Sequence, residues 1–340
     1  MEYISEKVLE NTKNAIETAS NIVIVTHMNP DGDAIGSSLG LYHFLKLSGK
    51  SVTVITPNSY PDFLHWLPGD DDVVDFDRKS KKASRLIGEA DTFFLLDFNE
   101  LKRIGKMGEV VSKNKTATKI LIDHHPNPVE KCTIELSDIR VSSTAELVFH
   151  LLSLLNNELV SDINVSECLF TGIMTDTGCF SFNSSRPSTF EAVSALLKSG
   201  INKDKIYDNL YNNFSDDRMK LLGFSLDKRM TVIPEYKTAY ISLTMEEMKM
   251  YNFSVGDSEG FVNFPLSIKG VVFTVLFLEK KGYVKLSLRS KGDFPANEVA
   301  KKYFNGGGHK NAAGGESMIS LSETIKKFES ILPEYTHLLK

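Results

Sequence analysis

Four short segments of the chain carry carboxylate and imidazole side chains at or just after the ends of expected strands and helices. They are THMNPDGDA with His27, Asp31 and Asp33, LLDFNE with Asp97, LIDHHP with Asp123, His124 and His125, and TDTGCF with Asp176. Carboxylates and imidazoles without clustered thiolates suit Mn²⁺, the first expectation, or Mg²⁺ better than structural zinc. The set exceeds what one ion uses, so two ions sharing a carboxylate are expected. Such a pair lowers the pKa of a shared water and clamps a phosphoryl group for hydrolysis.

Each segment by itself also fits a structural role. His27 alone would end a strand, and Asp31 and Asp33 would make turn hydrogen bonds. Asp97 would cap a helix and Asp176 would occupy an ordinary turn at a helix end. Two adjacent histidines directly after a buried strand are harder to explain in this way. The coincidence of all four segments at element ends therefore favours a metal site over independent structural roles.

The elements that must position these segments form a βαβ rhythm in the first half of the chain. Strand-like apolar runs alternate with helix-like segments, and these runs are NIVIVTH, SVTVITP, DTFFLLDF and KILIDHH. Strands that are apolar on both faces are typical of a parallel sheet covered by helices, which predicts a doubly wound, mainly parallel α/β domain. Ligands bind outside the carboxyl edge of such a sheet, so residues distant in sequence can meet there.

The length of 340 residues favours two domains. Helical patterns over 143–200 complete a catalytic domain assigned to 1–214, and a polar helical connector is expected at 215–229. A smaller α+β domain over 230–340 contains a hairpin about EKKGY, a helix, a glycine-rich loop and a closing helix. The active site is expected in a cleft between the two domains.

Composition narrows the function classes further. A net charge of -5 does not indicate binding to long duplex nucleic acid. Three cysteines without metal-type spacing argue against a disulfide framework, and no apolar stretch is long enough to span a bilayer, so a cytoplasmic protein is expected. Walker, calcium-loop, dinucleotide-binding and serine-hydrolase motifs are absent from the sequence.

The second domain carries residue types suited to binding phosphate. Arg289 lies beside Ser287 at an expected strand end, where its planar guanidinium could contact phosphate or simply face solvent. A glycine run could form an amide nest for a terminal phosphate or a flexible turn. This run and its neighbour are Gly306, Gly307, Gly308 and His309. Phe261 and Phe264 could stack a base, but their spacing favours core packing.

With these residues in hand, the sequence resembles the DHH phosphoesterase family, whose name is the triplet at 123–125. The motifs HMNPDGDAIGS, LDFNELKRIG and TDTG follow the family's order, and EGFVNFPL, SLRS and GGGHKNAAGG resemble the DHH-associated C-terminal domain. The resemblance covers nearly the whole chain and is strongest to the NrnA-like branch. It implies hydrolysis of very short RNAs and of the 3′-phosphate of 3′-phosphoadenosine 5′-phosphate.

The resemblance also implies individual roles. One ion would be held by His27, Asp31 and Asp97, and a second by Asp33, Asp97, His124 and Asp176. Asp123 would orient His124, and His125 would face the scissile phosphate. Arg103 could reach the same phosphate, while Arg289 and His309 would grip a terminal phosphate of the substrate.

Other substrates stay open at this point. They include linear or cyclic dinucleotides, inorganic polyphosphate and pyrophosphate. A non-enzymatic alternative is a nucleotide-binding regulator that uses metal only to hold its ligand. Short RNA or nucleotide phosphates are the expected partners, a homodimer is compatible with the sequence, and neither long duplexes nor a membrane are expected.

Overall fold

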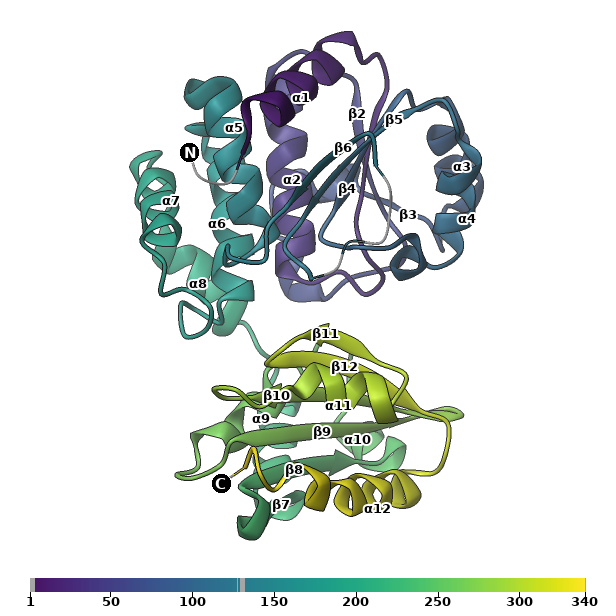
Figure 1. The fold of residues 1–340 in the computed structure, drawn as a ribbon, viewed down its shortest axis with the longest axis vertical. Helices are drawn as coiled ribbons and strands as arrows, with labels where there is room; N and C mark the ends of the chain where they lie inside the picture. The colour runs from purple at the N-terminus through teal and green to yellow at the C-terminus, as the bar shows by residue number, and fades with distance from the viewer. Residues whose placement is uncertain (1–3, 127, 129–131, 340) are drawn as a thin grey trace. The chain divides into compact units, whose positions relative to one another are not determined.

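The computed structural model describes residues 4–126, 128 and 132–339, and the chain divides into two compact units (Figure 1). Unit 1 comprises residues 1–213 and unit 2 residues 214–340. The connector expected at 215–229 corresponds to helix α9, Asp216–Lys228, which belongs to unit 2. No helix among the described residues is long and apolar enough to cross a membrane.

Unit 1 is built on a wholly parallel sheet with the order β3-β2-β1-β4-β5-β6. The strands are β1 Ile22–Val25, β2 Val52–Thr56, β3 Val74–Asp75, β4 Thr92–Leu96, β5 Thr118–Asp123 and β6 Ile134–Ser137. The helices are α1 Glu6–Thr18, α2 Gly32–Leu47, α3 Ser80–Glu89, α4 Lys106–Lys113, α5 Thr144–Val160, α6 Ile163–Asp176, α7 Pro187–Lys198 and α8 Lys203–Tyr211. The prediction of a doubly wound α/β domain is confirmed.

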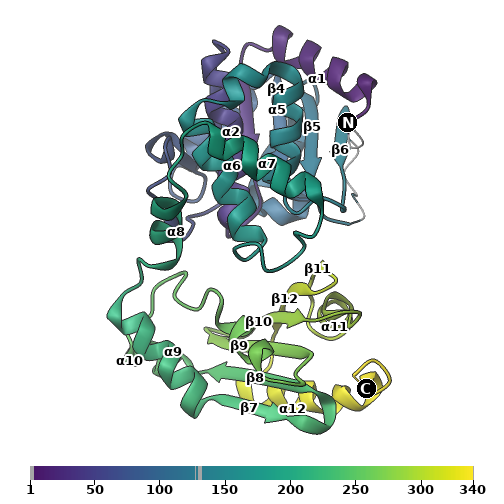
Figure 2. The same cartoon turned by 90° about the vertical axis from the view of Figure 1, so that its left-hand side faces the viewer.

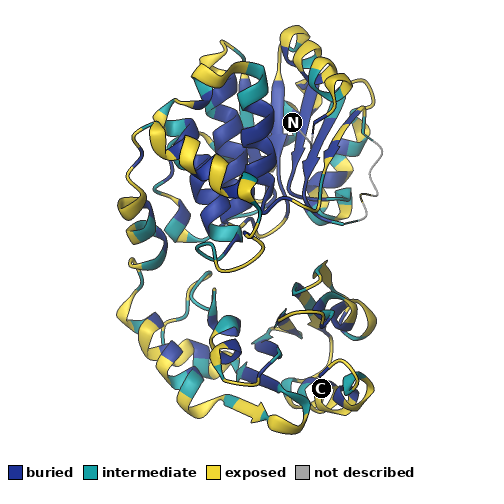
Figure 3. Ribbon diagram, turned by 60° about the vertical axis from the view of Figure 1, so that its left-hand side comes forward, coloured by how far each residue is buried: buried dark blue, intermediate teal, exposed yellow. Residues whose placement is uncertain are grey.

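Both faces of this sheet are buried, which explains its unbroken apolar strands. In β1, Ile22 and Ile24 pack in the core that contains residues of α2, α5 and α6. The alternate residues Val23 and Val25 pack in a second core with residues of α3 and α4. Figures 2 and 3 show the first helical layer and the buried strands beneath it. Helices therefore cover both faces of the sheet. Loops follow the ends of its strands.

Unit 2 contains a mixed sheet with the order β11-β12-β10-β9-β8-β7, in which only the β8–β9 pair is parallel among the described strands. The strands are β7 Met230–Ile233, β8 Thr238–Leu243, β9 Phe273–Lys280, β10 Tyr283–Ser290, β11 Gly307–His309 and β12 Ala312–Ser317. The remaining helices are α10 Met245–Met250, α11 Ala296–Tyr303 and α12 Leu321–Ile331. β9 and β10 form the hairpin predicted about EKKGY.

Two expectations for unit 2 are wrong. Gly307 and Gly308 of the glycine run form with His309 an edge strand, β11, paired with β12, rather than a loop, and Gly306 directly precedes it. Glycine is required there because a Cβ on Gly306 would lie 2.0 Å from the Gly314 carbonyl oxygen, and Gly308 has a φ of +134°. Phe261 is buried as expected, but Phe264, three residues later in a 3-10 helix, is 45% exposed.

Candidate metal centre

His27 follows strand β1 and is buried. Its Nδ1 lies 2.9 Å from the Met28 carbonyl oxygen, and since a carbonyl oxygen only accepts, Nδ1 donates this hydrogen bond. In a neutral ring the free lone pair is then on Nε2, the atom a metal would use. Nε2 lies 3.3 Å from Asp97 Oδ2 and 4.0 Å from Asp31 Oδ1. The backbone thus aims the imidazole at two carboxylates.

The two aspartates of the first motif have different surroundings. Asp31 is the N-cap of α2, and its Oδ1 accepts hydrogen bonds from the amides of Asp33 and Ala34, at 3.1 Å each. Its side chain is 58% exposed, whereas that of Asp33 is only 1% exposed. Both oxygens of Asp33 accept from backbone amides, Oδ2 from Thr144 at 2.7 Å and Oδ1 from Ala145 at 2.8 Å.

Asp97 lies at the centre of the site, one residue beyond β4. Its φ of +66° is uncommon for a residue with a side chain and is typical of a functional position held by its surroundings. The backbone amide donates to the Ile122 carbonyl oxygen of β5 at 3.1 Å. Its carboxylate reaches both sides of the cluster, because Oδ2 faces His27 and Oδ1 lies 3.5 Å from His124 Nε2.

The triplet at the end of β5 differs in one respect from its expected arrangement. Asp123 Oδ1 accepts a 2.7 Å hydrogen bond from Nδ1 of His125, so Asp123 orients His125 rather than His124. The His124 Nε2 atom lies 3.8 Å from Asp33 Oδ2 and 3.6 Å from Asp176 Oδ2. Asp176 ends helix α6, so its carboxylate comes from a different element than the strand-end ligands.

Within the described residues of unit 1, three groups of side chains could each hold a metal ion, and two of them are joined through the predicted bridging ligand; the third is Asp97, Asp123 and His125. Of the two joined groups, one is His27, Asp31 and Asp97, and the other is Asp33, His124 and Asp176; within each, the potential ligand atoms lie within 4.8 Å of one another. Asp97, 3.5 Å from His124, connects them. Adjacent ligands about 2.1 Å from an octahedral ion would lie roughly 3 Å apart. The 3.3–3.8 Å separations here are somewhat wider than that. The oxygen and nitrogen donors fit a divalent cation.

The electrostatics of the cluster also fit a cation. Burial raises the pKa of Asp33 well above its usual value, and the charges of Asp97 and Asp176 raise it further. Burial also acts to raise the pKa of Asp97, but the hydrogen bond from His27 is among the effects that lower it far below the usual range. Burial acts to lower the pKa of His27, yet Asp97 and Asp31 raise it overall. Divalent ions would neutralise this crowded negative charge.

Arg103, predicted to contact phosphate, lies beside this centre. It belongs to a 3-10 helix, Leu101–Ile104, and its carbonyl oxygen accepts a 2.8 Å hydrogen bond from the Met28 amide. Burial acts to lower the pKa of His27, and the Arg103 charge lowers it as well. The Arg103 carbonyl oxygen helps to fix the loop that follows β1, because it accepts the hydrogen bond from the Met28 amide.

The residues predicted to bind substrate lie in unit 2, on or next to strands β10 and β11, which β12 separates. Arg289 of β10 and His309 of β11 are both registered opposite Ala312 of β12, so the three form one row across the sheet. Ser287 lies two residues before Arg289 and therefore on the same face. Leu286 and Leu288 point to the opposite face, into the core beneath α11 and α12. The row therefore has a polar side chain at each end, Arg289 and His309, and the small side chain of Ala312 between them.

Sequence patterns did not identify Thr144 as part of the site. Its hydroxyl donates to Asp97 Oδ1 at 2.9 Å, and its amide donates to Asp33. Ser-Ser-Thr before an apolar helix is an ordinary capping pattern, so only the contacts with Asp33 and Asp97, which are distant in sequence, reveal this role. The one sequence feature that could have drawn attention to this helix start was Glu146, an acidic residue within an otherwise apolar run.

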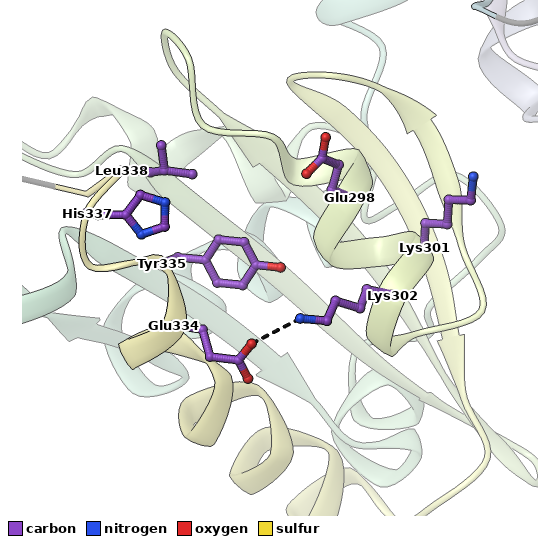
Figure 4. A pocket seen from close by; sticks show the side chains of 7 residues that line it. All are labelled: Glu298, Lys301, Lys302, Glu334, Tyr335, His337 and Leu338. Carbon is purple, nitrogen blue, oxygen red and sulfur yellow. Dashed lines mark hydrogen bonds and ion pairs between the residues drawn. The ribbon is translucent and has the colours of Figure 1, made fainter.

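A surface hollow of about 720 Å³ in unit 2 is unrelated to these groups (Figure 4). It contains none of the predicted site residues, and Lys302 Nζ is paired with Glu334 Oε2 at 3.1 Å. Its lining residues are Glu298, Lys301, Lys302, Glu334, Tyr335, His337 and Leu338.

Comparison with known proteins agrees with the fold. Residues 21–173 match the DHH family, N-terminal domain, and residues 238–334 match the DHHA1 domain. Over 293 residues the chain is 32% identical to the bifunctional oligoribonuclease and PAP phosphatase NrnA of Thermus thermophilus, covering 86% of this chain and 83% of that protein. The Bacillus subtilis protein of the same name is 24% identical over 301 residues, covering 88% and 90%.

A solved structure, described as an exopolyphosphatase-related protein from Bacteroides fragilis, matches with a TM-score of 0.95 at 46% identity. The match covers 100% of this chain and 99% of that one. The α/β fold, the acidic and histidine side chains at its strand ends and these relatives define the class of the protein as a metal-dependent phosphoesterase. Within that class, the chain belongs to the DHH family and carries a DHHA1 domain.

Proposed function

We propose that this protein is an Mn²⁺-dependent enzyme that removes nucleotides from one end of short oligoribonucleotides and the 3′-phosphate from 3′-phosphoadenosine 5′-phosphate. The observation that carries the proposal is the pair of ligand groups connected by Asp97. The NrnA relatives, which are named for oligoribonuclease and PAP phosphatase activities, support this choice of substrates.

In this proposal one ion is held by His27, Asp31 and Asp97, and the other by Asp33, Asp97, His124 and Asp176. When bound, two such ions supply a water of lowered pKa and neutralise charge on the phosphoryl oxygens. Mixed imidazole and carboxylate donors make Mn²⁺ the preferred ion and Mg²⁺ the alternative.

The side chains around the ions have separate tasks. His125 faces the scissile phosphate, and Asp123 holds its ring through the 2.7 Å hydrogen bond to Nδ1. That hydrogen bond turns the other ring nitrogen of His125, Nε2, away from Asp123. Arg103 adds positive charge next to His27, where the phosphoryl group gathers negative charge during hydrolysis.

Unit 2 captures the substrate in this proposal. The Arg289 guanidinium offers a planar fork for a terminal phosphate, and His309 lies in the same row, two strands away. Ala312 between them leaves the row open, and Ser287 adds a hydroxyl on the same face. Gly307 and Gly308 precede His309 in β11, whereas the amide of Gly306 donates to the Ala300 carbonyl oxygen at 3.1 Å. A grip on a charged end favours short substrates and release of one nucleotide at a time.

Product analysis tests the proposal. Metal-stripped protein with added Mn²⁺ is offered 3′-phosphoadenosine 5′-phosphate, RNA of two to five nucleotides, a cyclic dinucleotide and polyphosphate, with Asp97→Ala as the inactive control. Release of AMP and of single nucleotides by the wild type alone is expected. Near-normal activity of Asp97→Ala would overturn the two-metal mechanism.

Polyphosphate is the second candidate substrate, because the Bacteroides fragilis relative is described as exopolyphosphatase-related. Turnover of polyphosphate alone, or of the cyclic dinucleotide alone, would keep the metal mechanism and replace the substrate. Binding of nucleotides without turnover of any of the four would instead indicate a metal-dependent regulator.

A further inference from the structure

The N-terminus of helix α5 contacts both metal-ligand groups through one residue. Thr144, the first residue of the helix, is fully buried. Its amide donates to Asp33 Oδ2 at 2.7 Å, and its hydroxyl donates to Asp97 Oδ1 at 2.9 Å. Because a carboxylate oxygen can only accept, the hydroxyl proton points at Asp97. One side chain and its own backbone thus fix carboxylates from two distant segments.

These contacts use donors that every helix start leaves available. The first amides of a helix have no partner within the helix, and the helix dipole favours negative charge at that end. The Asp33 carboxylate takes two of these amides, those of Thr144 and Ala145. The third, that of Glu146, is taken by the Ser143 hydroxyl at 3.0 Å. The Thr144 hydroxyl is therefore the donor beyond ordinary capping, and it is aimed at the shared ligand.

Glu146 anchors this helix start from within the protein. The side chain is fully buried, and Oε2 accepts from the Ser142 amide at 2.9 Å and from the Thr189 hydroxyl at 2.9 Å. Oε1 accepts from the Ser188 hydroxyl at 3.0 Å. Ser188 and Thr189 belong to α7, so the carboxylate joins the start of α5 to the start of α7. The position of Thr144 is therefore set by a buried hydrogen-bond network.

We infer that Thr144 is a positioning residue of the metal centre, and that Glu146 is the anchor that keeps it in place. This inference rests on the proposed function, because it assigns Thr144 the task of holding Asp97 and Asp33 in the orientation that two divalent ions require. Asp97 needs such support, because its backbone has an uncommon positive φ and its carboxylate is shared between the two groups.

The test compares Thr144→Val with Thr144→Ser. Valine keeps the shape and the backbone amide but removes the hydroxyl, whereas serine keeps the hydroxyl. Mn²⁺ binding to the metal-stripped full chain is measured by calorimetric titration, and the melting temperature is measured without metal. We expect valine to weaken Mn²⁺ binding by about 10- to 100-fold, as for other partners of metal ligands. Serine should retain near-normal binding, and both metal-free variants should stay fully folded at the temperature of the titration, with the melting temperature of the valine variant lowered by no more than the loss of one hydrogen bond.

Three results would overturn the inference. These are wild-type Mn²⁺ affinity in Thr144→Val, equal losses of affinity in valine and serine variants, and a fall in metal-free stability large enough to account for the lost affinity. Thr144→Ala replaces valine in the comparison if the valine chain does not fold. The wild-type protein reports on the proposed function separately: if it binds no Mn²⁺, the metal centre itself is wrong, whatever the variants do.

Discussion

Asp123 Oδ1 lies 2.7 Å from His125 Nδ1, and both side chains are buried. This pair fixes the tautomer of His125 and turns Nε2 away from Asp123. His124, the neighbouring residue, instead directs Nε2 toward Asp33, Asp97 and Asp176. The adjacent histidines thus have different partners: His124 lies near three carboxylates, whereas His125 is hydrogen-bonded to Asp123 and lies 3.6 Å from Asp97 Oδ1.

The pair predicts the behaviour of Asp123→Asn. An amide oxygen can still accept from Nδ1 but no longer stabilises a positively charged imidazole. We expect kcat to fall about 10- to 100-fold, as is typical when the partner of a functional histidine is changed. Mn²⁺ affinity should change little, because Asp123 is not among the proposed ligands. Steady-state kinetics and metal titration check this, with Asp204→Asn at an exposed position as the control; a large loss of Mn²⁺ affinity in Asp123→Asn would contradict it.

Removal of metal should destabilise unit 1. Asp33 is buried near the charges of Asp97 and Asp176, which raise its pKa, and a divalent cation relieves this repulsion. Binding to the folded state alone stabilises it by about 2.7 kcal/mol at a concentration 100 times Kd. We therefore expect chelation to lower the melting temperature and added Mn²⁺ to restore it, as followed by calorimetry. Asp33→Asn should reduce this metal-dependent increase; an undiminished increase would mean that the ion binds elsewhere.

Arg289 should act on substrate capture and not on the metal centre. Its guanidinium suits bidentate contact with a terminal phosphate, which is worth about 1.5–3 kcal/mol for a charged hydrogen bond. We expect Arg289→Ala to raise KM about 10- to 100-fold for phosphate-ended substrates and to leave Mn²⁺ affinity unchanged. Lys326→Ala, on the exposed side of α12, is the matched loss of a positive charge. An equal loss on analogues with uncharged ends would remove the proposed role.

Glu146 should make the free energy of unfolding fall as the pH is lowered into the acid range. Burial acts to raise its pKa, but hydrogen bonds, from His150 and Ser142 among others, lower it from 4.5 to about 2. A folded-state pKa below the unfolded value stabilises the protein above pH 4.5, and this contribution is lost as pH falls toward 2. We expect Glu146→Gln to cost about 3 kcal/mol at pH 7. Denaturant unfolding should show this difference from wild type narrowing below pH 4.5; a constant difference would contradict the assignment.

The fold was predictable where burial imposes a pattern. Strands β1, β2, β4 and β5 are covered on both faces, so their unbroken apolar runs indicated a parallel sheet. β3 has only two residues, and β6 alternates between buried and exposed positions, so neither gives that signal. β11 and β12 are rich in glycine, which has low strand propensity, and only pairing with neighbouring strands makes them strands.

The candidate site likewise contains residues that the sequence predicts and residues that it does not. His27, Asp97 and Asp123 follow directly after strands or end them, so the rule for parallel sheets brings them together. Thr144 and Glu146 lie in a helix, and their contacts depend on how α5 packs against α2 and α7. No local pattern encodes that packing. The sequence also could not predict which of the two adjacent histidines bonds to Asp123, because that depends on the directions of their side chains.

The β11–β12 pair offers a test of how closely the row of Arg289, Ala312 and His309, which is proposed to bind substrate, depends on backbone geometry. At Gly306 a Cβ would lie 2.0 Å from the Gly314 carbonyl oxygen, whereas at Gly307 it would meet nothing within 4 Å. The two positions are adjacent in sequence, so Gly306→Ala and Gly307→Ala differ mainly in this contact. We expect Gly306→Ala to displace β11, and with it His309, from its register opposite Ala312.

The expected result is a rise in KM for 3′-phosphoadenosine 5′-phosphate of at least about tenfold in Gly306→Ala, equivalent to about 1.4 kcal/mol of lost binding. Gly307→Ala should stay within about twofold of wild type, and Mn²⁺ affinity should be normal in both variants, since every proposed metal ligand lies in unit 1. Steady-state kinetics measures KM for the two variants, and metal titration measures their Mn²⁺ affinity. Equal KM values in the two variants would show that capture of the phosphate does not require the β11 edge strand in its observed register.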